Sequence, residues 1–185
     1  MDVVKQQQTQ LWSKDFVLIS WANFFLCFSY HMVATTLPVF VMAMDGGEFA
    51  AGLIVGVVTI TALLIRPFVG SVLDSLGRKT ILMFGLAIFA VTVISYEWLR
   101  SLGLLFLSRA VQGVGWGISS TALGTIVSDI IAPTKRAEGI GYFGISINVS
   151  MALAPVTGIW LKQAHGFTVL FFVATLSVAL SMSIV

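Results

Sequence analysis

The sequence predicts an all-α membrane protein with six transmembrane helices, and three observations support this fold class. Hydrophobic residues make up 58% of the 185 residues, and charged residues make up only 10%. The mean hydropathy is +1.00. A soluble domain carries about 25% charged residues, so lipid must be the main solvent of this chain. The third observation is that the apolar residues form six long runs separated by short polar segments.

Each run approaches the roughly 20 residues that cross a bilayer as a helix. The predicted helices cover about residues 16–44, 50–73, 80–96, 102–127, 139–161 and 167–185. The connections between them are residues 45–49, 74–79, 97–101, 131–138 and 162–166. Short connections force consecutive helices to lie antiparallel and adjacent. We therefore expect an N-terminal tail, residues 1–15, and one six-helix domain, residues 16–185, whose first helix is too long for a cleaved signal peptide.

Lysine and arginine are distributed unevenly between the two sides of the predicted bundle. The tail, the second loop and the fourth loop contain Lys5, Lys14, Arg78, Lys79, Lys135 and Arg136, whereas the outer loops contain Arg100 and Lys162. The positive-inside rule therefore predicts a multi-pass protein of the plasma membrane with a cytoplasmic N-terminus. A net charge of +2, without a basic patch interleaved with aromatic residues, argues against nucleic acid as a partner.

The segment between the second and third predicted helices, residues 70–80, reads GSVLDSLGRKT. Asp74 ends a helix, where the helix dipole disfavours an anion, so we expect it to pair with Arg78 four residues later. Gly77 permits a tight turn, and Gly70 lets another helix approach closely. Taken alone, this pattern describes a solvated turn with a surface ion pair worth at most about 1 kcal/mol.

The same segment resembles the signature between helices 2 and 3 of the major facilitator superfamily, roughly G-x-L-x-D-x-x-G-R-K/R. The resemblance implies a secondary transporter of about twelve helices in two halves, each a 3+3 inverted repeat, and this chain is similar to the N-terminal half. In that family the cluster holds the halves in one conformation together with an acidic residue at the end of helix 4, which corresponds to Asp129. The segment 131–139 is similar to the family's next cytoplasmic loop. The implied conformational switch comprises Gly70, Asp74, Gly77, Arg78, Lys79, Asp129 and Arg136.

The fourth predicted helix contains residues 108–117, SRAVQGVGWG, which resemble the family motif R-x-x-Q-G-x-G. Arg109, Gln112 and Trp116 share one helical face. Arg109 lies roughly 10 Å below the membrane boundary, where facing lipid costs several kcal/mol, so we expect it to face the bundle interior. The alternative is that it snorkels to the surface. In related transporters this arginine supports proton transfer or holds an anionic group.

The first predicted helix places Asn23, Cys27, Tyr30 or His31, Thr35 and Pro38 at helical spacing. His31 lies near the bilayer midplane, where transporters bind substrates and ions, and it can titrate near neutrality. The alternative is a hydrogen-bonded packing residue. No carboxylate lies deep in a predicted helix, so proton coupling would use His31, the Asp74 cluster indirectly, or a residue of another half. The candidate substrate and proton pathway is Asn23, His31, Arg109, Gln112 and Trp116.

The fifth predicted helix resembles an antiporter-type motif in which glycines precede G-P-x-x-G-G. Ala154 replaces the glycine before Pro155, and Ile159 replaces the last glycine. A proline kink with small residues also serves helix packing. We assign this packing role to Gly113, Gly144, Pro155 and Gly158.

The predicted function is alternating-access transport of a small molecule, with proton-coupled efflux of a drug or sugar-like compound favoured, and without a cofactor, metal or enzymatic activity. The chain stops inside an apolar run at residues 183–185, so we expect a fragment that lacks a C-terminal six-helix half and does not transport alone. Two alternatives remain. One is a non-transporting six-span scaffold, and the other is an intramembrane hydrolase in which Ser119 would need His31 or His165 within hydrogen-bond reach.

Overall fold

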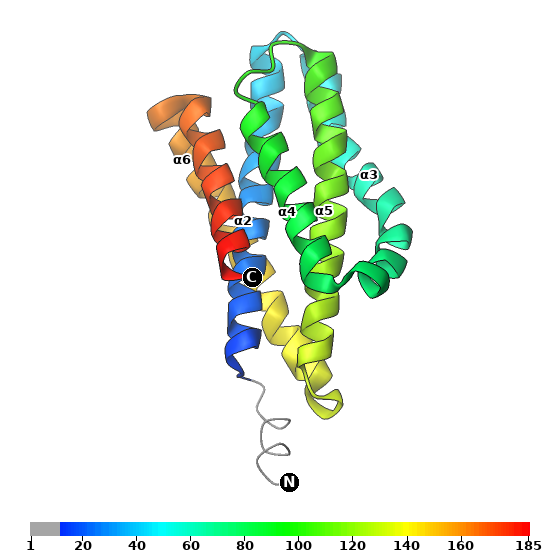
Figure 1. The fold of residues 1–185 in the computed structure, drawn as a ribbon. Helices are drawn as coiled ribbons and strands as arrows, with labels where there is room; N and C mark the ends of the chain where they lie inside the picture. Colours follow the sequence, from blue (N-terminus) through cyan, green and yellow to red (C-terminus); the bar gives the residue numbers. More distant parts are fainter. Residues whose placement is uncertain (1–11) are drawn as a thin grey trace, which may run out of the picture.

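The computed structural model describes residues 12–185, which form helices and connecting turns without a strand (Figure 1). The helices are α2 (Lys14–Ala43), α3 (Gly47–Leu76), α4 (Arg78–Ser95), α5 (Leu102–Ile130), the 3-10 helix η1 (Pro133–Lys135) and α6 (Arg136–Ile184). Most of the predicted tail, including Lys5, lies outside the described residues, so its contribution to the charge count stays a prediction. The all-helical fold class is confirmed.

The first helix begins and ends at residues suited to these positions. The Ser13 hydroxyl accepts a hydrogen bond from the Phe16 backbone N–H at 3.1 Å, which caps one of the free amides of the first turn. Asp15 adds a favourable anion there. The helix ends in a tight turn in which Asp45 and Gly47 have φ angles of 58° and 71°. This turn makes α2 and α3 antiparallel neighbours, as the short loop predicts.

The predicted loop 74–79 is much shorter in the structure. The helix α3 continues to Leu76 and α4 begins at Arg78, so Gly77 alone separates them. Gly77 has φ 87°, a conformation that costs glycine little and other residues more. The chain therefore reverses at a single residue.

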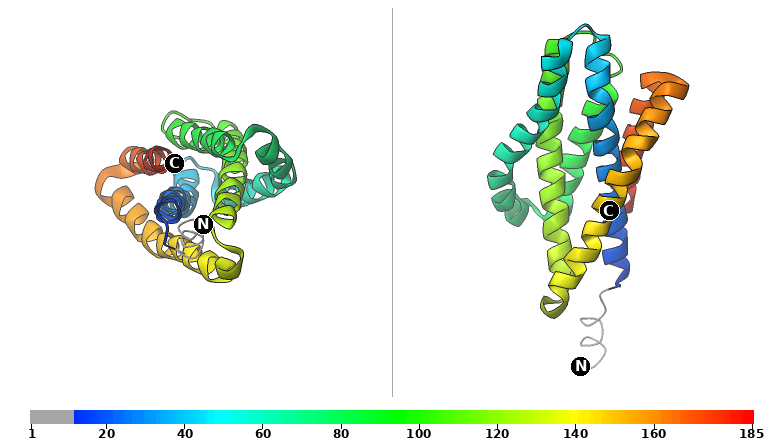
Figure 2. Two further views of the ribbon diagram at one scale, coloured as in Figure 1. Left: turned by 60° about the horizontal axis from the view of Figure 1, so that its bottom comes forward. Right: turned by 180° about the vertical axis from the view of Figure 1, so that it is seen from behind.

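The last two predicted helices form one long helix, α6, which changes direction at Gly166. Gly166 has φ 82° and ψ −177° and is the non-helical residue inside this helix. The two arms, residues 136–165 and 167–184, lie on either side of it, and Figure 2 shows that the second arm runs back toward the end of the bundle where α2 begins. The predicted loop 162–166 is therefore wrong, because the helix continues to the residue before Gly166.

Within residues 12–185, four helical stretches, rather than six, are long and apolar enough to cross a membrane. They are Lys14–Ala43, Gly47–Leu76, Arg78–Ser95 and Pro133–Ile184. The two arms of α6 count as one stretch because the helix is continuous. The 29-residue α5 is not among the four, since Arg109, Gln112 and several glycines and serines lower its hydropathy. The sequence prediction of six spans is thus supported only in part.

The helices pack as two groups around a common core. The helix α2 packs chiefly against α6, and α5 lies against both α3 and α4. Glycines set the close spacing of α5: a Cβ atom at Gly113 would stand 2.6 Å from the Val58 carbonyl oxygen of α3, and one at Gly115 would stand 2.9 Å from the Gly85 carbonyl oxygen of α4. Small residues of this kind let helix backbones approach in a membrane.

Candidate functional site

Arg78, at the start of α4, forms a salt bridge with Asp129, near the end of α5. The two side chains are 39% and 44% exposed. The predicted pairing of Arg78 with Asp74 is therefore wrong. Asp74 is exposed and makes no ion pair with residues 12–185. The reason is geometric: Gly77 breaks the helix between the two residues, so the i, i+4 spacing of a continuous helix does not apply.

The salt bridge lies in a groove of about 380 Å³ at the end of the bundle where α2 begins. Asp15, Arg78, Lys79 and Asp129 line it together with apolar residues of α2 and α5. We call these four residues the charge cluster. Asp15 is a member that sequence reasoning missed, although its place in the first turn of the first helix, on the same predicted side as Arg78, was a usable signal. Arg136 is exposed and makes no salt bridge within the described chain.

The two glycines of the predicted switch differ in their surroundings. Gly77 forms the turn between α3 and α4. Gly70 is exposed, and no atom lies within 4 Å of where its Cβ would stand. The predicted close approach of a helix to Gly70 is therefore not made by residues 12–185.

Arg109 is fully buried between α5, α3 and the end of α4, instead of snorkelling to the surface. Its Nε donates to the Ile54 carbonyl oxygen at 3.1 Å, and its Nη1 donates to Gln112 Oε1. The Tyr96 hydroxyl donates to the same Oε1 at 2.7 Å. We call these four residues the buried arginine network. Tyr96 was missed because one tyrosine at the end of an apolar helix carries no distinguishing pattern.

The buried arginine network has unused donors. Arg109 Nη2 and Gln112 Nε2 are buried without a hydrogen-bond partner among residues 12–185, and the partners that Arg109 does have there are neutral oxygens. Buried donors of this kind raise the free energy of the folded state unless an acceptor is supplied. The network therefore retains capacity for a water molecule or another acceptor.

Trp116 lies apart from this network, although it shares a helical face with Arg109 in sequence. Its ring stacks on Tyr30 of α2, with centroids 4.1 Å apart and planes at 16°. His31 is half-buried beside Tyr30, with the ring centroids 5.1 Å apart, and its imidazole makes no hydrogen bond with the described residues. The helical spacing allowed either Tyr30 or His31 to continue the polar face of the first helix. Tyr30 contacts α5, whereas the ring nitrogens of His31 make no hydrogen bond within residues 12–185.

Asn23 joins α2 to α6. Its Nδ2 donates to Ser146 Oγ at 2.8 Å, and its Oδ1 accepts from Cys27 Sγ at 3.7 Å. Gly158 makes a close approach, since a Cβ there would stand 2.9 Å from Met32 Cγ of α2. Gly144 has no atom within 4 Å of that position. The predicted packing role of Gly144 is therefore not served by contacts within residues 12–185, and Pro155 is half-buried.

The arrangement needed for a hydrolase is not assembled. Ser119 Oγ is buried without a hydrogen-bond partner. His31 lies on α2, and His165 is exposed beside the Gly166 kink. Among residues 12–185 no group of three or more His, Cys, Asp or Glu side chains is placed to hold a metal ion.

Comparison with known sequences places this geometry in context. The family described as Major Facilitator Superfamily matches residues 19–185. The quinolone resistance protein NorA of Staphylococcus aureus (strain Mu50 / ATCC 700699) is 28% identical over 173 residues, which cover 91% of this chain and 44% of NorA. Multidrug resistance protein 1 of Bacillus subtilis (strain 168) is 26% identical over 153 residues, 82% of this chain and 39% of that protein. The chain spans less than half the length of these curated relatives.

Two solved structures share the fold. The crystal structure of peptide transporter POT (E310Q mutant, in complex with alafosfalin) matches with a TM-score of 0.84 and 20% identity, over 96% of this chain and 39% of that chain. The human organic anion transporter MFSD10 (TETRAN) matches with a TM-score of 0.73 and 17% identity, over 91% of this chain and 46% of that chain. At these identities the two structures show the fold alone.

Proposed function

Because this chain belongs to the major facilitator superfamily, we propose that it forms the N-terminal half of a secondary transporter that exports small molecules by alternating access. The chain is an all-helical, multi-pass membrane protein. The observation that carries the proposal is the salt bridge between Arg78 and Asp129, which joins the α3–α4 turn to the end of α5. The partner is a C-terminal six-helix half.

The exposure of the salt bridge suits a contact that forms and breaks in each cycle. Both partners are more than one-third exposed, and ion pairs of this kind contribute about 0.2–1 kcal/mol. Binding of a ligand shifts a conformational equilibrium only by its differential affinity for the two states, so a weak latch is easily released. Asp74 and Gly70 are exposed in the last turns of α3, where the second half would supply their contacts.

The orientation and the number of spans complete the proposal. The tail and the charge cluster face the cytoplasm, the two arms of α6 and the helix α5 each span the membrane, and the protein resides in the plasma membrane. What supports this is the accumulation of cations at the end of the bundle that holds Lys14, Arg78, Lys79, Lys135 and Arg136. The positive-inside rule associates such an end with the cytoplasm.

The substrate is proposed to be a drug-like organic compound, moved in exchange for protons. The names of the sequence relatives, quinolone resistance and multidrug resistance proteins, support this class. The proposed pathway includes Asn23, His31, Arg109, Gln112 and Trp116. His31 is the proposed proton carrier because its imidazole is half-buried and free of hydrogen bonds to the described residues.

Efflux of the dye ethidium from cells that express the complete transporter tests the proposal. Arg78→Ala should slow efflux about three- to fivefold, equivalent to about 0.7–1 kcal/mol on the limiting barrier. Arg100→Ala is the control, since Arg100 is an exposed cation outside the charge cluster and makes no salt bridge within residues 12–185, and it should stay within about twofold of wild type. Equal rates for wild type and Arg78→Ala would contradict the latch.

The scaffold alternative is separated from transport by Asp74→Asn. A scaffold keeps its function after this change, whereas the transporter loses efflux because the proposed contact of Asp74 with the second half is weakened. The chain alone, reconstituted in proteoliposomes, should give no flux above protein-free vesicles.

A further inference from the structure

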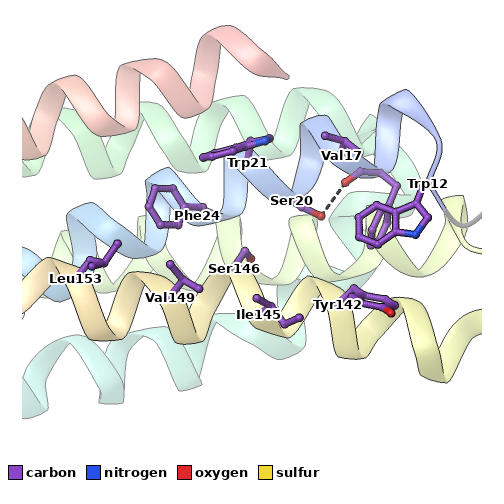
Figure 3. A pocket seen from close by; sticks show the side chains of 11 residues that line it. Trp12, Val17, Ser20, Trp21, Phe24, Tyr142, Ile145, Ser146, Val149 and Leu153 are labelled. Atoms are coloured by element: carbon purple, nitrogen blue, oxygen red, sulfur yellow. Dashed lines mark hydrogen bonds between the residues drawn. The ribbon is translucent and has the colours of Figure 1, made fainter.

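A groove runs between the first half of α2 and the first arm of α6, and its chemistry differs from that of the charge cluster. Its volume is about 420 Å³. Figure 3 shows Trp21 and Phe24 of α2 facing Val149 and Leu153 of α6 across it. No charged side chain occurs among the described residues that line it. We call it the aromatic groove.

The two serine hydroxyls in the aromatic groove are already bonded within the protein. The Ser20 hydroxyl donates to the Phe16 carbonyl oxygen at 2.7 Å. The Ser146 hydroxyl donates to the Phe143 carbonyl oxygen at 2.6 Å and accepts from Asn23. A ligand with several polar groups would find few hydrogen-bond partners here to replace those it had in water. A hydrocarbon chain has no hydrogen bonds to lose on binding.

The dimensions of the groove match one hydrocarbon chain. From Trp12 to Phe24 on α2, and from Tyr142 to Leu153 on α6, it extends for about 16 to 18 Å at the helical rise of 1.5 Å per residue. One leaflet contributes roughly half of the 30 Å hydrocarbon core. Spread over that length, the volume corresponds to a cross-section of about 25 Å², far below that of a helix, which is 10 to 12 Å wide with its side chains.

One end of the groove lies at the level of the membrane interface. The rings of Trp12 and Tyr142 meet there with centroids 5.0 Å apart, and tryptophan and tyrosine concentrate at the boundary between lipid and water. Lys14 and Asp15, both exposed, follow Trp12 almost directly. The other end, at Leu153, reaches toward the middle of the bilayer.

The groove also lies on a different face of α6 from a stripe of small and polar residues. Gly141, Gly144 and Asn148 form this stripe, and at 100° per residue it is displaced by about a quarter of a turn from Ile145 and Val149. The small-residue stripe suits close helix contact, which leaves the groove face to lipid.

We propose that the aromatic groove binds one acyl chain of a phospholipid from the leaflet on the N-terminal side of the protein. The site requires only that the chain is embedded in a membrane. Naming that leaflet the cytoplasmic one rests on the proposed orientation. A negative result in the transport experiments would therefore not count against the lipid site. A negative result in the lipid experiment would likewise not count against the transport function.

Quenching of tryptophan fluorescence by brominated phosphatidylcholine tests the site directly. Trp21 lines the groove and is 52% exposed, so a variant of the chain that retains Trp21 and has phenylalanine at the other tryptophans reports on it. In vesicles of brominated lipid its fluorescence should fall at least twofold relative to unbrominated lipid. Val149→Phe fills the groove opposite Trp21 and should reduce this quenching to less than half.

Two controls make the outcome decisive. Val91→Phe adds the same ring at an exposed valine of α4, far from the groove, and should leave the quenching unchanged. A reporter that retains only Trp160, exposed on α6 outside the groove, should be quenched equally with and without Val149→Phe, which shows that the variant still folds. The proposal is overturned if Trp21 is not quenched, since protein then covers the groove, or if Val149→Phe leaves its quenching unchanged, since Trp21 then meets only bulk lipid.

Discussion

Arg78 and Arg109 differ in their exposure to solvent and in the charge of their partners. Arg78 pairs with the carboxylate of Asp129 at an exposed end of the bundle. Arg109 is fully buried and bonds only to neutral oxygens of Ile54 and Gln112. The comparison teaches that a complete ion pair near water is the weaker contact, because solvent screens it. Truncating the buried arginine is expected to cost more, because it leaves a cavity and removes the side-chain donor to the Ile54 carbonyl oxygen.

The largest effect on stability is expected for Arg109→Ala. It leaves a cavity and strips the Ile54 carbonyl of its donor, so the free energy of unfolding by SDS in mixed micelles should fall by about 3 kcal/mol or more. Arg100→Ala, at an exposed arginine in the connection between α4 and α5, should change it by less than about 0.5 kcal/mol. Equal losses for the two variants would remove the distinction between buried and exposed arginines.

Arg109→Met separates the volume of that side chain from its charge. Methionine keeps much of the volume and removes a buried cation that has no anionic partner, and hydrophobic replacements of buried charges are often neutral. More than half of the loss seen with Arg109→Ala should be recovered in the same unfolding assay. A loss as large as that of alanine would show that the hydrogen bonds, and not the packing, carry the stability.

A middle-sized effect is expected where α5 touches α3. Gly113→Ala places a Cβ 2.6 Å from the Val58 carbonyl oxygen, and overpacking of this kind costs about 1–3 kcal/mol. Gly124→Ala is the matched control on the same helix, since it has no atom within 4 Å, and it should be neutral or slightly stabilising. Unfolding of the two variants side by side checks the prediction, which fails if Gly113→Ala is the more stable one.

The smallest effect on stability is expected for Arg78→Ala. An exposed ion pair contributes about 0.2–1 kcal/mol and is screened by salt. The difference from wild type in the unfolding assay should therefore shrink further between 0.05 and 0.5 M NaCl, values near which the Debye length falls from about 14 to about 4 Å. If the free energy of unfolding fell by more than about 2 kcal/mol and this loss did not change with salt concentration, the pair would be a structural contact.

The helices were largely predictable from the sequence, and the side-chain partners were not. Apolar runs place α2 to α5 within a few residues, and a loop of polar character correctly marks the turn at Asp45. The continuity of α6 was missed because Lys162, Gln163 and His165 are polar, yet the helix continues through them until the backbone turns at Gly166. Sequence spacing favoured Asp74 as the partner of Arg78, whereas the partner is Asp129, which only the family resemblance had placed in the same cluster.

The contacts of the buried arginine network could be anticipated only in part. An arginine and a glutamine three residues apart on one helix are expected to contact each other. The Ile54 carbonyl and Tyr96 come from other helices, and their arrival depends on the close packing of α5 that Gly113 and Gly115 permit. Likewise, Trp116 shares a face with Arg109 in projection but stacks on Tyr30, because α2 passes on that side.

The central claim, that the salt bridge between Arg78 and Asp129 is a latch and not a structural brace, is tested most directly by exchanging its charges. Ethidium efflux should fall roughly tenfold in Arg78→Asp and in Asp129→Arg, and recover to within about threefold of wild type when the two changes are combined, a recovery of about 0.7 kcal/mol or more on the barrier. If the combined variant is as slow as either single variant while remaining as stable as wild type, the latch assignment is contradicted.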